Sequence, residues 1–259
     1  MIKALIFDLD GTIVRPDTGT YSAETAKAFA ALRKKGIYLI AATGRSPYEL
    51  KVTKMIDGLS FDAIVCLNGQ YCYTETTDLF INAFPEEQAE QMLKIIEESG
   101  VPCAVIEKDG TTINKVLPYV EAVQAGINMP VPKLRDLNDA NRKGIIMLTA
   151  FLPEEEESTF LQALPPVISA RWSPNATDLL PAGSGKSSGV EIALKHFGLK
   201  WEDTYAFGDG DNDYEMLKRA GKGFAMQNSR KCLLSGEFEI VDSVYHDGVV
   251  KTLRQYELL

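Results

Sequence analysis

Short apolar runs that end in polar residues recur along this chain. Each run is dominated by aliphatic and aromatic side chains and is too short for a buried helix, which is typical of a strand covered on both faces of a parallel sheet. Between the first two runs, Ser22 is a helix-capping residue and Gly36 a helix stop signal, which predicts a crossover unit of strand, helix and strand. The runs are residues 4–7, 37–41, 61–67, 204–207 and 223–226.

This alternation of strands and helices is interrupted in the middle of the sequence. Pro85 opens an acidic amphipathic segment that ends near Gly100, and Asp109-Gly110 is a hairpin signal between two short runs. Helices that alternate with antiparallel strand pairs are typical of a separate α+β module. The predicted fold is α/β, with a doubly wound, parallel-sheet (Rossmann-like) core at residues 1–83 and 182–259 and an inserted α+β domain at residues 84–181.

Two carboxylates stand where the first predicted strand ends. Asp8 and Asp10 are followed by Gly11 and Thr12, and because residues i and i+2 of an extended chain point the same way, both carboxylates project from the strand's carboxyl end. Open α/β sheets bind their ligands at this end. Two carboxylates that close repel each other unless one is protonated or a cation lies between them. The alternative is a polar turn that only closes the strand.

A second acidic cluster, residues 208–213, follows the fourth apolar run. Its aspartate spacing imitates a calcium-binding loop, but Tyr214 and Ala220 occupy the positions at which that loop requires glycine and glutamate. In a parallel sheet this cluster would lie beside Asp8 and Asp10. Several converging carboxylates need a hard divalent cation, and with phosphate and water as further oxygen ligands Mg²⁺ fits best.

The second predicted strand leads into a helix. Thr43 follows that strand, and Ser46-Pro47-Tyr48-Glu49 is a capping box with proline at the first helical position. The free N–H groups at this helix start would point toward whatever Thr43 binds.

Lys186 lies in Gly183-Ser184-Gly185-Lys186-Ser187, which looks like part of a nucleotide-binding P-loop. Leu180 occupies the position of that motif's first glycine, so we set the nucleotide interpretation aside. Lys186 is then either an exposed lysine near a helix start or a mobile positive charge for a phosphorylated ligand, a role that an acidic phosphate-binding site requires.

The composition excludes some classes of partner. The chain has 259 residues, with 36 acidic and 27 basic side chains and a net charge of -9, which repels nucleic acids and anionic membranes. Without a visible signal peptide or membrane span, we expect a cytoplasmic protein with no nucleic-acid or membrane partner and no evident obligate protein partner. The four cysteines lack zinc-binding spacing and are expected to be buried free thiols.

The motifs occur in the order found in phosphatases of the haloacid dehalogenase (HAD) superfamily: Asp8-Leu-Asp-Gly-Thr, Ala42-Thr-Gly-Arg, Lys186 and the 208–213 cluster. The sequence resembles the Cof-type branch of this superfamily, which carries a large α+β cap between its second and third motifs. By this resemblance the inserted module would close over the core and exclude water. One departure is Asp178, which stands where this branch commonly has glutamate.

The resemblance implies a role for each motif residue. Asp8 would be the nucleophile that forms an aspartyl phosphate, and Asp10 the acid/base that protonates the leaving alcohol and then activates water. Thr43 and Lys186 would complete the catalytic set, while Arg45 would reach substrate or cap, or form a salt bridge. The implied metal ligands are Asp8, Asp10 through its main-chain carbonyl, Asp209 and Asp213. The implied phosphate-binding and substrate-binding residues are Leu9, Asp10, Thr43, Gly44, Arg45, Lys186 and Asn212.

The expected function is a Mg²⁺-dependent phosphatase acting on a small phosphorylated metabolite, by resemblance a sugar phosphate. One alternative is a phosphotransferase or mutase, in which a sugar hydroxyl accepts the phosphoryl group. Another is a protein that senses a phosphorylated metabolite without turnover. The segment Arg171 to Asn175 of the inserted module is a candidate for substrate specificity.

Overall fold

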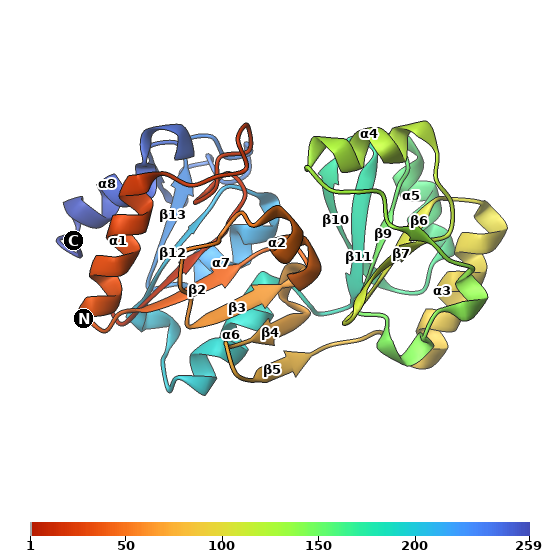
Figure 1. The fold of residues 1–259 in the computed structure, drawn as a ribbon, viewed down its shortest axis with the longest axis horizontal. Coiled ribbons are helices and arrows are strands. Elements are labelled where there is room, and N and C mark those ends of the chain that lie inside the picture. The colour runs from red at the N-terminus through yellow and green to blue at the C-terminus, as the bar shows by residue number, and fades with distance from the viewer. Residues whose placement is uncertain (1) are drawn as a thin grey trace. The chain divides into compact units, whose positions relative to one another are not determined.

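The computed structural model describes residues 2–259, which form two compact units (Figure 1). One unit contains the chain up to Phe80 together with Gly185–Leu259, and the other is Ile81–Ser184. The sequence places the domain boundaries after residues 83 and 181, and the assignment of the inserted unit as a cap stays a prediction. Among the described residues, no helix has both the length and the apolar character that a membrane crossing requires.

The first unit is built on an eight-stranded sheet with β1 (Ala4–Phe7) near its centre. The four residues of β1 are fully buried. The strands from β14 to β3 pair in parallel, whereas β4 runs antiparallel to β3. A doubly wound, parallel-sheet core is therefore confirmed. The strand order is β14 (Glu239–Val241), β13 (Lys222–Met226), β12 (Thr204–Gly208), β1, β2 (Tyr38–Ala42), β3 (Ala63–Cys66), β4 (Tyr71–Tyr73), β5 (Asp78–Ile81).

Helices cover both faces of this sheet. Ile6 of β1 belongs to a core cluster with Val190 and Leu217, whereas its neighbour Phe7 contacts Phe29, with ring centroids 5.0 Å apart. Because successive strand residues point to opposite faces, α6 and α7 cover one face and α1 the other, where α8 lies beside it (Figure 1). The helices are α1 (Ala23–Lys34), α2 (Pro47–Thr53), α6 (Lys186–His196), α7 (Tyr214–Arg219) and α8 (Gly248–Gln255).

The second unit contains a six-stranded sheet in which antiparallel pairing predominates. Its core joins Met92 and Phe160 of two helices to Leu148 and Leu179 of the sheet, so this unit buries an apolar cluster of its own. The strand order is β10 (Val167–Ser173), β11 (Ala176–Pro181), β9 (Met147–Ala150), β6 (Cys103–Glu107), β7 (Gly110–Ile113), β8 (Lys133–Leu134), and the helices are α3 (Glu86–Ser99), α4 (Pro118–Gly126) and α5 (Glu154–Ala163).

The four cysteines are free, but one differs from the sequence prediction. Cys66, Cys72 and Cys103 are buried, whereas Cys232 is exposed, so the prediction of a buried thiol is wrong there. Cys232 lies in the irregular segment between β13 and β14, where its thiol is 2.6 Å from Oδ1 of Asp211. No apolar side chains cover a thiol in a surface turn. Cysteine spacing in the sequence does not predict this exposure.

Candidate active site

Three of the predicted site residues directly follow neighbouring parallel strands. Asp8 follows β1, Thr43 follows β2 and Asp209 follows β12. In the sheet register Phe7 is paired with both Ala41 and Phe207, and the backbone N–H of Asp8 donates to the carbonyl of Phe207 at 2.9 Å. The parallel register therefore brings the three strand ends to one edge of the sheet.

Lys186, the first residue of α6, joins two of the predicted carboxylates. Its Nζ donates to Oδ1 of Asp8 at 2.5 Å and to Oδ1 of Asp213 at 2.7 Å. The lysine is only 2% exposed, Asp8 5% and Asp213 0%, so the interpretation of Lys186 as an exposed surface lysine is wrong. Burial of a lysine is tolerated because two carboxylates share its charge and its hydrogen bonds.

Asp213 also closes the loop that follows β12. Its Oδ2 accepts hydrogen bonds from the backbone N–H groups of Asp209 and Gly210, both at 3.0 Å. Both carboxylate oxygens of Asp213 are therefore engaged within the protein. Asp213 is therefore better suited to orient Lys186 and the Asp209 backbone than to bind a metal ion directly.

Asp209 lies directly against the loop of the first motif. Gly11 has a φ of +84°, and a Cβ at this position would lie 2.2 Å from Oδ2 of Asp209, so only glycine permits the approach. The side chain of Asn228 donates to the carbonyl of Gly11 at 2.8 Å and to Oδ2 of Asp209 at 3.2 Å. The side chain of Leu9 is fully buried, so Leu9 could contact a phosphoryl group only through its backbone.

Asp10 and Arg45 form a bidentate ion pair in this unit. Nε of Arg45 donates to Oδ2 of Asp10 at 2.9 Å, and an Nη atom donates to Oδ1 at 2.7 Å. Arg45 also donates its backbone N–H to Oγ1 of Thr43 at 3.1 Å. Of the two readings that the sequence left open for Arg45, the salt bridge is the one present here.

Asp8 and Asp209 resist ionisation because they are buried among other carboxylates. Burial raises the pKa of Asp8 well above its ordinary value; Lys186 opposes this shift, and Asp213 and Asp209 add to it. Burial and Asp213 also raise the pKa of Asp209 to about 7. Burial disfavours the charge of Lys186, but Asp213 and Asp8 prevail and raise the pKa of its ammonium group. The lysine stays charged, and one further positive charge would favour ionisation of Asp8 and Asp209.

The donor set at this edge fits a hard divalent cation. Asp8, Asp209 and Asp213 each offer a carboxylate oxygen, and these oxygens lie within 4.8 Å of one another. Oxygen donors of this kind are those that Mg²⁺ prefers. Because Asp213 is engaged by Lys186 and two backbone N–H groups, Asp8 and Asp209 are the stronger candidates for direct ligands.

Asn212 contacts Asn68, which is not among the predicted site residues. Nδ2 of Asn212 donates to Oδ1 of Asn68 at 2.8 Å, and a Cβ on Gly44 would lie 3.3 Å from the Asn68 carboxamide. The sequence signal was Asn68-Gly69 at the end of a predicted strand, which by itself indicates only a turn. Its link to Gly44 and Asn212 depends on tertiary contacts.

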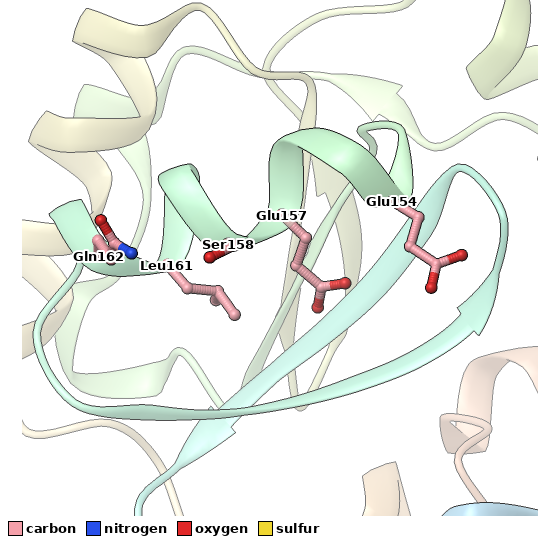
Figure 2. A pocket seen from close by; sticks show the side chains of 5 residues that line it. All are labelled: Glu154, Glu157, Ser158, Leu161 and Gln162. Atoms are coloured by element: carbon pink, nitrogen blue, oxygen red, sulfur yellow. The ribbon is translucent and has the colours of Figure 1, made fainter.

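The predicted specificity segment of the inserted unit is engaged in its own hydrogen bonds. Arg171 is paired with Glu157 and donates to the carbonyl oxygens of Ser173 and Pro174 at 2.9 and 3.1 Å. Figure 2 shows a pocket in this unit that is lined by α5 side chains, Glu157 among them. The pocket has a volume of about 550 Å³. It contains no predicted site residue, and the Arg171 contacts indicate that this arginine holds the turn between β10 and β11.

The fold and this site define an α/β enzyme with a carboxylate-rich centre for phosphoryl groups. The chain belongs to the haloacid dehalogenase-like hydrolase family, whose sequence model matches residues 5–253. It is a HAD-type phosphatase of the Cof subfamily, a hydrolase that acts on phosphoric monoesters.

Individual relatives agree with this assignment. YkrA of Bacillus subtilis, which is named as a phosphatase, is 30% identical over 260 residues, 99% of this chain and 98% of YkrA. An HMP-PP phosphatase of Escherichia coli is 28% identical over 239 residues, 88% of this chain and 85% of that protein. Among solved structures, the phosphatase BT1666 of Bacteroides thetaiotaomicron has a TM-score of 0.91 at 29% identity, covering 100% of this chain and 96% of BT1666. The HAD subclass IIB sugar phosphatase BT4131 has a TM-score of 0.87 at 29% identity, covering 99% of this chain and 100% of BT4131.

Proposed function

We propose that this protein is a Mg²⁺-dependent phosphatase of small phosphorylated metabolites, with sugar phosphates as the favoured class, and that Asp8 carries the phosphoryl group. The observation that carries the proposal is the buried cluster in which Lys186 bridges Asp8 and Asp213 beside Asp209. Sugar phosphates are favoured because BT4131, similar over nearly the whole chain, is a sugar phosphatase. The HMP-PP phosphatases keep other small phosphorylated metabolites in the candidate set.

The reaction begins when a carboxylate oxygen of Asp8 attacks phosphorus and the bond to the substrate alcohol breaks. Lys186, adjacent to that carboxylate, offsets the charge that spreads over the equatorial phosphoryl oxygens. Thr43 and the Gly44 backbone, which follow β2, would donate hydrogen bonds to the same oxygens. Mg²⁺ held by Asp8, Asp209 and the main-chain carbonyl of Asp10 would supply further positive charge there.

Proton transfer is assigned to Asp10, two residues beyond the nucleophile. In the first step its carboxyl group gives a proton to the leaving alcohol. In the second step the resulting carboxylate takes a proton from water, whose oxygen attacks the aspartyl phosphate and frees Asp8 and inorganic phosphate. A phosphate monoester hydrolyses extremely slowly in water, so division into two assisted steps gives a large advantage.

The test is phosphate release from an activated aryl phosphate with Mg²⁺, followed by a panel of sugar phosphates, nucleotides and cofactor phosphates. Asp8→Asn should lower turnover by about a thousandfold or more, because the nucleophile is lost. Asp211→Asn is a matched control in the motif loop that carries Asp209, since Asp211 is exposed and contacts Arg230 and Cys232 instead of the cluster. Wild-type turnover in Asp8→Asn, or positional isomers in place of free phosphate, would overturn the proposal.

A further inference from the structure

The turn that follows β3 has an unusual backbone. Leu67, Asn68 and Gly69 have consecutive φ values of +52°, +52° and +96°, and all three residues are buried. Asparagine visits this left-handed region more readily than most residues, but leucine rarely does. Conformations of this kind persist only where the surrounding structure holds them, and they concentrate at functional sites.

The backbone of this turn is attached to two segments of the candidate active site. The N–H of Asn68 donates to the carbonyl of Thr43 at 3.0 Å, and the N–H of Leu67 donates to the carbonyl of Arg45 at 3.0 Å. On its other side, a Cβ on Gly69 would lie 2.0 Å from the carbonyl oxygen of Gly185, the residue before Lys186. The turn therefore separates and supports the Thr43 segment and the start of α6.

The side chain of Asn68 reaches a third segment. Its Oδ1 accepts the hydrogen bond from Asn212 at 2.8 Å, while its carboxamide packs on Gly44, where a Cβ would lie 3.3 Å from both Oδ1 and Nδ2. Asn68 is 3% exposed, whereas Asn212 is exposed on a short turn. A buried, fixed carboxamide thus holds an exposed one that would otherwise sample several rotamers.

We propose that Asn68 is a positioning residue of the active site, which fixes the carboxamide of Asn212 opposite Gly44 for contact with the phosphoryl group. The inference rests on the proposed function, because it assumes that Asn212 and Gly44 bind the phosphoryl oxygens. Asn68 itself is too deeply buried to meet the substrate. Asn68 would act by holding the Asn212 carboxamide, before the substrate binds, in the orientation that contacts the phosphoryl oxygens.

A double-mutant cycle separates this role from a purely structural one. Asn68→Gly removes the carboxamide but accepts the positive φ, so the turn can be kept. We expect it to lower kcat/KM for an aryl phosphate with Mg²⁺ by about tenfold to a hundredfold, as for loss of a hydrogen bond to a charged group. Asn212→Ala should lower it at least as much, and the double variant should be no worse than Asn212→Ala alone.

Asn128→Gly is the matched control. Asn128 also has a left-handed backbone, with a φ of +57°, and lies in the other unit, so the same substitution should leave kcat/KM at the wild-type value. All variants are assayed well below the lowest melting temperature, so that loss of stability does not lower the rate. The proposal is overturned if Asn68→Gly has the kcat/KM of wild type. It is also overturned if the double variant lowers kcat/KM by the product of the two single-variant factors.

Binding of inorganic phosphate in the presence of Mg²⁺ gives a readout independent of turnover. Asn68→Gly should weaken phosphate binding by no more than Asn212→Ala does, and the double variant should bind phosphate as weakly as Asn212→Ala alone. Asn128→Gly should leave phosphate binding unchanged. A wild-type protein that binds phosphate without hydrolysing any ester would contradict the proposed function and leave the role of Asn68 measurable. Unchanged phosphate affinity in Asn68→Gly, with hydrolysis intact in wild type, would refute the positioning role alone.

Discussion

The Arg45 guanidinium holds both oxygens of the Asp10 carboxylate, although the two residues lie 35 positions apart. Arg45 is the more buried partner, with 15% of its side chain exposed against 40% for Asp10. A planar guanidinium that is largely buried fixes the direction of a carboxylate better than a lysine would. If Asp10 transfers protons, one of its oxygens must leave Arg45 for each transfer, and the remaining contact with Arg45 fixes the direction of the carboxyl group.

Replacement of Arg45 by glutamine is expected to affect substrates unequally. An alkyl phosphate needs a proton on its leaving oxygen, so its first turnover should slow by about tenfold or more. An aryl phosphate leaves without that help, so the burst of aryl alcohol should keep nearly the wild-type rate while steady-state turnover falls. Rapid-mixing measurements of the released alcohol check this.

Arg254→Gln is the control for this experiment, because Arg254 is exposed and pairs with Glu24 of α1 instead of a residue of the site. It should leave both substrates at wild-type rates. Equal losses for alkyl and aryl substrates in Arg45→Gln would show that Arg45 does not act through proton transfer.

The start of α2 illustrates what a sequence can predict at the scale of an element. Ser46 accepts from the N–H of Glu49 at 3.2 Å, and the Glu49 carboxylate accepts from the N–H of Ser46 at 2.7 Å, which confirms the predicted capping box. All its partners lie within three residues, so local sequence suffices. The turn at Leu67–Gly69 could not be predicted in this way, because its left-handed backbone is held by Thr43, Arg45 and Gly185.

Loss of this cap should cost stability more than activity. Ser46→Ala is expected to lower the free energy of unfolding by about 1 kcal/mol, because the N–H of Glu49 loses its acceptor. Chemical denaturation at neutral pH measures the change. Ser158→Ala, the same substitution at an exposed position inside α5, should be neutral or slightly stabilising, since alanine is the better helix former. An equal loss from both substitutions would contradict the capping argument.

At the scale of the whole molecule, parallel strand order accounts for the part of the site that the sequence could predict. Asp8, Thr43 and Asp209 each follow a strand, and adjacent parallel strands end at the same edge of a sheet. The contacts that complete the site could not be predicted from the sequence, because they join loops that are far apart in the chain. Asn228 beside Asp209 and Asn68 beside Asn212 are such cases. In the sequence, Asn68-Gly69 indicates only a turn.

The same edge should make the stability of the metal-free protein depend on pH. The pKa of Asp209 is raised from 3.8 to about 7, chiefly by burial and by Asp213, so the folded protein holds this proton more tightly than the unfolded chain. Its contribution to stability is therefore full below about pH 4 and is lost as pH rises toward 7. With metal removed by a chelator, Asp209→Asn should become progressively more stable than wild type across this range, as thermal melting would record.

Mg²⁺ should reverse this order above pH 7. Binding to the ionised carboxylates of the folded state alone raises the melting temperature of wild type as the Mg²⁺ concentration increases. Asp209→Asn lacks that ligand charge and should show a much smaller shift, while Asp211→Asn should respond as wild type does, because Asp211 lies outside the cluster. Parallel pH profiles for wild type and Asp209→Asn, together with equal responses to Mg²⁺, would mean that Asp209 neither carries the raised pKa nor binds the cation.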